Sequence, residues 1–466
     1  MPGTATIAKS KSSRISKFIQ WIEAPVSAAP LAVFRIIFGA LMLVSTIRFI
    51  ALGWVHEHFV APQFHFKYFG FAWVEVLPPF WMYALHVLMI ICSLGIMLGA
   101  FYRVAAIGFF LSFTYTELID ITYYLNHYYF VSLVSFLLIL VPANAFFSID
   151  AHRNPALQRR YVPRWTIAIF QFQLTLVYFY AGLAKINYDW LINALPLKIW
   201  LPANDKVWII GDLFRYPATA YVFSWAGMLY DTLIPFFLMW RKTRFWAYLA
   251  VIGFHTMTGI LFQIGVFPVV MIFSTLIFFS PEFHQKLITG LKSLLNKLGF
   301  TTTNAATSGT TSSIFGGRKK LVYSFLIVYV SFQLLFPWRY LLYPGNLFWT
   351  EEGYRFSWRV MLMEKAGTAT FFVKDRESGR EGVVVNSEFL NRHQEKQMAF
   401  QPDMLLQFAH FLHYHYEAEG LEDPVVRVES YVMLNAHPSQ LIVDPKVNLA
   451  ETEGGWRHKE WILDWK

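Results

Sequence analysis

Long apolar runs constrain this chain more than any other feature of its sequence. Several of them exceed the roughly 18 residues that mark a membrane-crossing helix. Of the 466 residues, 56% are hydrophobic and 15% are charged, so the chain is far more apolar than a soluble domain of this length. We therefore predict a mainly α-helical fold, built as a polytopic transmembrane helical bundle.

Hydropathy and length divide the apolar sequence into about nine predicted spans. They cover residues 31–52, 80–101, 104–119, 128–148, 165–184, 219–240, 245–263, 266–280 and 321–338. The third and the eighth are short for a crossing. Either of these two could instead be buried in protein or re-enter the membrane from one side.

Basic residues gather in the segments that nine spans would place on one side of the membrane. These are Lys9, Lys11, Arg14, Lys17, Arg103, Arg153, Arg159, Arg160, Arg164, Arg241, Lys242, Arg244, Lys286, Lys292, Lys297, Arg318, Lys319 and Lys320. Such clustering is typical of a cytoplasmic face. The net charge of +9 therefore indicates orientation, and we expect membrane lipids and no nucleic acid as partners. On this reading residues 1–30 form a cytoplasmic tail.

The composition changes to that of a water-soluble domain after the last predicted span. We assign residues 31–338 to a transmembrane catalytic domain, which contains a flexible polar linker at 300–317. Residues 339–466 are assigned to an extramembranous α+β domain. The same topology places this domain in the periplasm or an organelle lumen.

Three patterns predict the elements of the C-terminal domain. Residues 368–372 and 382–385 are β-rich runs that flank a charged turn, which predicts a hairpin. Residues 402–419 have apolar side chains at a helical period, with proline in the first turn. Residues 425–434 alternate like a strand, with Val428 and Val432 on one face.

Lys185 is the most informative polar residue, because it ends the long apolar run 166–184. An ammonium at the edge of hydrocarbon is partly desolvated, which favours a neutral amine that can accept a proton. Lys185 is therefore a candidate base. The alternative is a snorkelling lysine whose stem lies in lipid and whose head reaches water.

Three further polar elements lie where hydrocarbon would penalise them. Asn126 and His127 stand at the mouth of the fourth span, where the imidazole could move protons or serve a structural role. Asp231 lies inside the sixth span and needs a partner or a proton, or bonds a neighbouring helix. His255 lies inside the seventh, and its depth raises the expectation of function.

Fourteen histidines invite a test for metal binding. Neither of two clusters has the carboxylate pattern of a di-iron bundle or the His-Glu-x-x-His of a zinc hydrolase, so we predict no metal site. The clusters are His56, His58 and His65 near the first span, and His410, His413 and His415 in the C-terminal domain. The single cysteine, Cys92, excludes an intramolecular disulfide.

Several segments, taken in order, resemble the vitamin K-dependent γ-glutamyl carboxylases, of the bacterial sort grouped as horizontally transferred transmembrane (HTTM) domain proteins. The most specific is Ala181-Gly182-x-x-Lys185 ending in Asp189-Trp190. The other segments that carry the resemblance are 34–39, 65–71, 81–83, 126–128, 254–257, 279–282 and 349–361. Together they run along nearly the whole chain.

The resemblance implies a lyase that couples quinone epoxidation to formation of γ-carboxyglutamate. In that family a lysine deprotonates vitamin K hydroquinone, O2 adds, and the strong base that results removes a glutamate γ-proton before CO2 is trapped. By resemblance, Lys185 is the base, assisted by Asn126 and His127, and a peptide or protein glutamate is the substrate. The residues expected to bind quinone or substrate are Tyr178, Asp231, His255, Tyr354, Trp358 and Arg359.

Two alternatives stay open from the sequence. A bacterial relative could keep quinone epoxidation and use the strong base on another acceptor. The chain could also be a non-catalytic membrane protein that binds or transports lipids. A transporter should show internal repeats, and none is convincing here.

Overall fold

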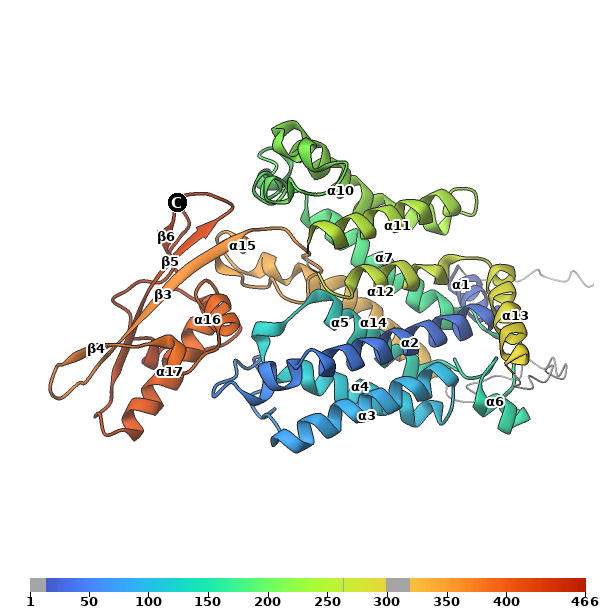
Figure 1. Cartoon of the computed structure of the whole chain (residues 1–466), viewed down its shortest axis with the longest axis horizontal. Helices are drawn as coiled ribbons and strands as arrows, with labels where there is room; N and C mark the ends of the chain where they lie inside the picture. The colour runs from blue at the N-terminus through green and yellow to red at the C-terminus, as the bar shows by residue number, and fades with distance from the viewer. Residues whose placement is uncertain (1–13, 263, 299–318) are drawn as a thin grey trace, which may run out of the picture.

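The computed structural model describes residues 14–262, 264–298 and 319–466. A helical bundle and a C-terminal domain lie side by side along its longest axis (Figure 1). The predicted linker at 300–317 and the first 13 residues of the predicted tail lie outside the described residues. The described part is mainly helical with a mixed α+β region at its C-terminal end, as the sequence predicts.

Helices occupy all nine of the predicted spans. The longer helices of the bundle are α1 (Arg14–Glu23), α2 (Ala29–Ala51), α3 (Pro79–Leu98), α4 (Tyr102–Ile119), α5 (Asn126–Leu140), α7 (Trp165–Ala184), α10 (Pro217–Met239), α11 (Arg244–Leu261), α12 (Phe267–Ser274), α13 (Pro281–Lys297) and α14 (Lys319–Leu335). The short helices α6 (Ile149–Arg153), α8 (Tyr188–Leu191) and α9 (Leu197–Trp200) lie between them in the sequence. Seven of the predicted spans match their helices to within a few residues at each end, whereas α5 and α12 end eight and six residues before the fourth and eighth spans do.

Length and composition support fewer crossings than nine. In the described residues, five helices are long and apolar enough to span a membrane, namely α2, α3, α7, α10 and α14 with the 3₁₀ turn that follows it. A sixth would be the pair Phe267–Phe278 and Pro281–Lys297, which is bent by 116°. The helix α5 is apolar but shorter than a usual span. The eighth predicted span is thus half of a sharply bent pair.

Small residues allow the helices of the bundle to cross closely. A Cβ atom at Gly39 would collide with the backbone of Met97, where α2 meets α3. A Cβ atom at Gly182 would collide with the backbone of Thr232, where α7 meets α10. Close helix contacts at glycine are typical of membrane bundles. The second crossing matters most, because it holds the end of α7 against the middle of α10.

The C-terminal domain is an antiparallel sheet covered by two helices. Its strands are β3 (Lys365–Lys374), β4 (Glu381–Val383), β5 (Val425–Leu434) and β6 (Gln440–Leu441), in the order β4-β3-β5-β6, with helices α16 (Arg392–Met398) and α17 (Pro402–Ala418). Val428 and Val432 are fully buried on one face of β5. The predicted hairpin, helix and alternating strand are all confirmed.

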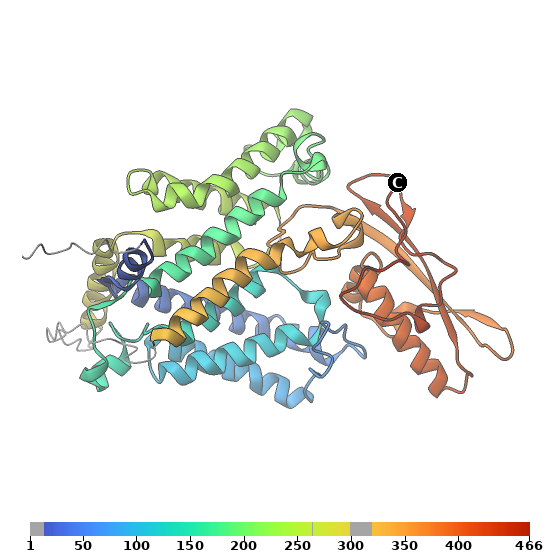
Figure 2. The ribbon, with the colours of Figure 1, turned by 180° about the vertical axis from the view of Figure 1, so that it is seen from behind.

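The domain lies at the loop end of the helices of the bundle (Figure 2), and buried polar contacts join the two parts there. Gln394 of α16 donates to the carboxylate of Asp120 at 2.8 Å and to the carbonyl of Phe64 at 2.7 Å. Asp120 also lies 3.3 Å from His65 Nδ1. The carboxylate of Asp120 is almost fully buried, and these bonds give it the partners that water would otherwise supply. The bundle and the C-terminal domain are therefore packed against each other at this junction.

Candidate active site

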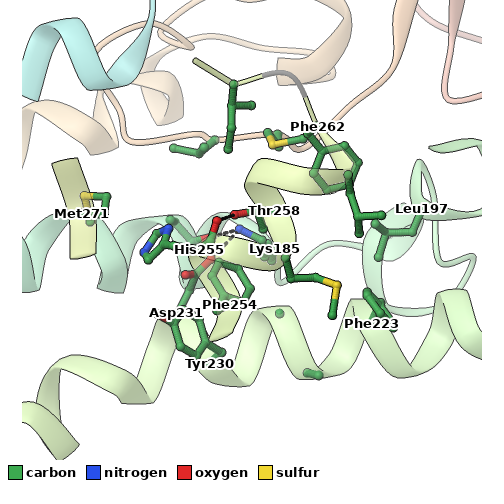
Figure 3. A pocket seen from close by; sticks show the side chains of 18 of the residues that line it. Lys185, Leu197, Phe223, Tyr230, Asp231, Phe254, His255, Thr258, Phe262 and Met271 are labelled. Atoms are coloured by element: carbon green, nitrogen blue, oxygen red, sulfur yellow. Dashed lines mark hydrogen bonds and ion pairs between the residues drawn. The ribbon is translucent and has the colours of Figure 1, made fainter. Parts of the chain in front are cut away.

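Lys185 points into the protein. It follows the last residue of α7, its side chain is 5% exposed, and its Nζ lies 2.7 Å from Oδ2 of Asp231 on α10. A weaker bond runs from Nζ to the carbonyl of Ala181 at 3.3 Å. Figure 3 shows the lysine and the aspartate facing one another. The snorkelling alternative is therefore wrong, because the head group does not reach water.

The crossing of α7 and α10 explains this pair. Gly182 brings the two backbones together one turn before Lys185, and Asp231 lies beside Thr232 at the contact. The indole ring of Trp190 covers the ammonium, with Nζ 5.3 Å from its centroid. A buried pair of this kind has no net charge, whether the shared proton is on the amine or on the carboxylate. The sequence anticipated a lone amine, and the structure supplies its partner.

The pair opens onto an apolar cavity of about 390 Å³, the Lys185 cavity. Its walls come from α7, α10, α11 and α12, from residues 185–200 after α7, and from one short segment of the C-terminal domain. The apolar side chains that line it include Val177, Trp190, Leu197, Phe223, Phe254, Met257, Phe262, Phe267, Met271 and Met361. Such a cavity accepts a flat, mostly apolar ligand that carries few polar atoms.

A second polar group lies on the wall of the same cavity. The Tyr178 hydroxyl is 2.8 Å from Nε2 of His255, and both side chains are buried. The Nδ1 atom of His255 and the hydroxyl of Tyr230 have no hydrogen-bond partner in the described part of the chain. Because buried polar atoms are nearly always bonded, these two atoms are available for hydrogen bonds to a ligand in the cavity. Tyr230 was missed from sequence, although it precedes Asp231.

Asn126 and His127 line a different cavity, of about 580 Å³, between the bundle and the C-terminal domain. We call it the junction cavity. Its lining is far more polar than that of the Lys185 cavity, and its polar members include Arg48, His58, Asn126, His127, Glu351, Tyr354, Arg355, His393, Gln397 and Gln401. The sequence placed Asn126 and His127 with Lys185, whereas the structure puts them in a neighbouring compartment.

The two cavities share a wall, which we call the partition. It consists of Ile264, Phe267, Val360 and Met361, each of which lines both cavities. The ring of Phe267 lies 5.4 Å from that of His127 and 5.8 Å from that of His255. His255 therefore lies against Phe267 on the side of the Lys185 cavity, and His127 lies against it on the side of the junction cavity. None of the four partition residues could be singled out from the sequence as a functional residue.

Asn126 holds the partition in place. Its Nδ2 donates to the carbonyl of Arg359 at 2.9 Å, directly before Val360. Its Oδ1 accepts from the hydroxyl of Tyr124 at 3.0 Å. Met361 adopts a positive φ of 50°, a conformation that costs free energy for a residue other than glycine. The asparagine amide therefore fixes a strained segment of the C-terminal domain.

The three tail residues singled out from sequence lie in three different places. Tyr354 lines the junction cavity. Trp358 is fully buried and stacks on Tyr129 with ring centroids 4.9 Å apart. Arg359 lines a third cleft, near the end of α7. The structure therefore does not bring these three residues together.

The histidine clusters are used in packing and hydrogen bonding. His58 stacks on Tyr123, which stacks in turn on His393, and burial lowers the pKa of His58 to about 4. His410 and His413 lie 2.8 Å from backbone oxygens. In the ranges that the structure describes, no group of three or more histidine, cysteine or acidic side chains is arranged to hold a metal ion.

An ion pair supports the floor of the junction cavity. Arg355 bonds the carboxylate of Asp403 at the start of α17. Burial opposes ionisation of Asp403, but the Arg355 guanidinium outweighs it and holds the pKa of that carboxyl below its usual range. Lys365 pairs with Glu351 at 2.9 Å, and there burial prevails and lowers the pKa of the lysine.

Two family models match the chain, and together they cover both parts of the structure. The HTTM domain matches residues 23–283, which contain the Lys185 cavity except for its wall from the C-terminal domain. The model described as "Vitamin K-dependent gamma-carboxylase, lumenal domain" matches residues 318–466. No solved structure matches the chain.

Proposed function

The chain belongs to the vitamin K-dependent gamma-carboxylase family, and from this premise we propose that it oxidises vitamin K hydroquinone to the epoxide and couples that oxidation to CO2 addition at glutamate. The observation that carries the proposal is the position of the Lys185 amine. It points into an apolar cavity, against a carboxylate, with unpartnered polar atoms on the same wall.

The Lys185 cavity fits a hydroquinone. Its volume of about 390 Å³ lies in the usual range for small-molecule sites, about 300–1,000 Å³. A naphthohydroquinone is a flat apolar ring with two hydroxyls, and the cavity offers two polar places, at Lys185 and at the unpartnered atoms of Tyr230 and His255. When bound, and with O2, the hydroquinone supplies the strong base that glutamate deprotonation requires.

Lys185 is the proposed acceptor of the first proton. Its amine is free to accept when the proton shared with Asp231 is on the carboxylate. The positive charge that then forms on Nζ balances the negative charge left on the hydroxyl oxygen. The reaction therefore separates charge only over a short distance, in surroundings where isolated charge is costly.

The apolar walls protect the basic chemistry. Water in the cavity would protonate any strong base formed there, and the aromatic and aliphatic lining leaves few groups that could hold water. Trp190 closes the end beside Lys185, and its indole nitrogen donates to the carbonyl of Ser224 at 2.9 Å. This hydrogen bond fixes the indole ring that covers the ammonium to α10.

The peptide that carries the glutamate acceptor is proposed to lie in the junction cavity, with its glutamate side chain passing the partition so that the base formed in the Lys185 cavity can take the γ-proton. The polar lining, with Arg48 on one wall, suits a carboxylate better than the Lys185 cavity does. His127 would face the acceptor from this side of the partition, while His255 faces the hydroquinone from the other. The family model that matches the C-terminal domain is described as lumenal, so we propose that the junction cavity faces the lumen or periplasm, where a secreted peptide substrate is found.

One assay tests the proposal and separates its alternatives. Purified protein is given vitamin K hydroquinone, O2, labelled bicarbonate and a glutamate peptide, and epoxide and fixed carbon are followed separately. Both products should form, and both should be lost in Lys185→Ala. Epoxide without fixed carbon would indicate another acceptor. Neither product from folded protein would favour a non-catalytic protein that binds or transports lipid.

A further inference from the structure

A third cleft, of about 720 Å³, belongs to neither cavity. It lies between the end of α7, the 3₁₀ turn η8 (Phe336–Leu342) and the C-terminal domain. We call it the interfacial cleft. The lining residues that matter here are Ile186, Trp338, Tyr340, Arg359 and Trp465.

Two buried donors in this cleft have no acceptor. Arg359 is 9% exposed, its Cζ lies 4.4 Å above the ring of Tyr340, and its Nε has no hydrogen-bond partner among the described residues. The indole Nε1 of Trp465 likewise has none in the ranges described. Unsatisfied buried donors are costly, most of all on a charged group. Acceptor oxygens of a ligand in the cleft would give each of these donors a partner.

The positive charge of the arginines at the cleft is only partly balanced by acidic side chains around it. Arg339, close enough to Arg359 to interact with it, uses its donors on uncharged oxygens, one of them Ser357 Oγ at 3.0 Å. Asp189 also lines the cleft, but its oxygens already accept from Asn435 and Asn193 at 2.9 Å. The cleft therefore favours an anion at the Arg359 end.

The rim of the cleft is apolar and lies where two spans end. The helix α7 ends directly before it, and the candidate span that contains α14 runs on to Leu342. Of the lining residues, Ile186 and Trp338 are 55% and 42% exposed, and Leu341 and Leu342, which follow Tyr340 in the chain, are 65% and 81% exposed. Exposed tryptophan and aliphatic side chains at the end of a span are typical of the membrane interface. The ligand must be anionic at one end and apolar at the other.

We propose that the interfacial cleft binds the phosphate group of a phospholipid. Arg359 and Trp465 donate to the phosphate oxygens, and the acyl chains lie along Trp338 and Ile186 toward the bilayer. A guanidinium matches phosphate geometry well because its donors are arranged as a rigid fork. Such a lipid joins the end of α7 to the C-terminal domain. This inference does not depend on the proposed function, because neither donor lines the Lys185 cavity.

Lipid binding to the purified full-length chain tests the proposal. Protein stripped of lipid in detergent is titrated with short-chain phosphatidylglycerol, and binding is followed by native mass spectrometry. We expect Arg359→Gln to weaken binding about tenfold, since it removes charge-assisted bonds. We expect Trp465→Phe, which keeps an aromatic ring and removes one neutral donor, to weaken it about threefold. Arg376→Gln, an exposed arginine of the same domain, is the matched control and should bind as the parent does.

Two competing ligands separate the sources of the phosphate. Inorganic phosphate should not displace the lipid at equal concentration, and short-chain diacylglycerol, which lacks the phosphate, should bind at least tenfold more weakly. Equal affinity of the parent, Arg359→Gln and Trp465→Phe would overturn the proposal. So would diacylglycerol that binds as tightly as phosphatidylglycerol, or inorganic phosphate that competes equally, since the latter identifies a site for a soluble anion.

Discussion

The Lys185 cavity and the junction cavity are neighbours built in different ways. The first is apolar, and its one charged pair is set by the crossing of two helices, α7 and α10. The second is polar, and it exists only because the C-terminal domain closes over the loops of the bundle. In the proposed function, charge is created only at the site buried in the bundle, and the polar acceptor is recognised at the junction.

The largest expected effect is a loss of catalytic activity when the Lys185 cavity is changed. Lys185→Ala removes the proton acceptor and should lower both epoxide and fixed carbon by about a thousandfold, in the range of a lost general base. Binding of a glutamate peptide to the junction cavity should not change, and equilibrium binding to the detergent-solubilised variant checks this. Loss of peptide binding together with activity would show that the cavities are not separate.

The second expected effect concerns the stability of the buried pair. Asp231→Ala leaves an uncompensated group in an apolar site and should lower the free energy of unfolding by about 3 kcal/mol. The double variant Lys185→Ala/Asp231→Ala should be more stable than Asp231→Ala alone. Thermal unfolding of the three variants measures the coupling. Additive losses would mean that the two side chains do not interact.

The partition provides a test of how the cavities communicate. Asn126→Ala frees the carbonyl of Arg359 and lets Val360 and Met361 shift, so we expect fixed carbon to fall about tenfold while epoxide changes little. The readout is the ratio of fixed carbon to epoxide. Asn144→Ala, an asparagine elsewhere in the bundle, serves as the control. Equal loss of both products would assign Asn126 to the hydroquinone chemistry instead.

The unpartnered atoms of the Lys185 cavity should contribute to hydroquinone binding. Tyr230→Phe removes one neutral hydrogen bond, and we expect KM for hydroquinone to rise about fivefold with kcat nearly unchanged. Phe254→Leu, at a neighbouring wall position with no polar atom, is the comparison variant for altered packing. An unchanged KM in Tyr230→Phe would remove this hydroxyl from the binding site.

The smallest effect concerns the support of the junction cavity. The pKa of Asp403 is lowered in the folded protein, so the carboxylate adds stability above its unfolded pKa of about 3.9, and this stability is lost as pH falls through the folded pKa. We expect a contribution of no more than about 1 kcal/mol, because the side chain is partly exposed. Thermal unfolding between pH 6 and pH 3 (about the range needed) should depend less on pH in Asp403→Asn than in the parent.

The helices could be predicted from the sequence because apolar length determines them locally. The nine predicted spans all contain helix, and the strand at 425–434 follows from its alternation alone. Nothing local could predict how many helices cross the membrane. The eighth span, for example, bends by 116° into an amphipathic helix.

The candidate site likewise has residues that the sequence could predict and an arrangement that it could not. Lys185 and Asp231 each stood out because a charge in an apolar run is costly, but 46 positions separate them, and only the packing of α7 on α10 pairs them. The partition could not be predicted, because its members are ordinary apolar residues from two distant segments. Arg359 stood out for its charge, yet its backbone serves the partition and its side chain faces the interfacial cleft.

The most direct test of the central claim is the pH dependence of epoxide formation in Lys185→Ala. If Lys185 serves to remove a hydroquinone proton, the variant can use only hydroquinone that has already lost this proton in solution. Raising the pH increases the concentration of that ionised hydroquinone and so makes up for the missing amine. The variant should then recover activity by about tenfold per pH unit, while the parent changes little. Epoxide formation by Lys185→Ala that equals the parent at every pH, or stays low and flat as pH rises, would contradict the account.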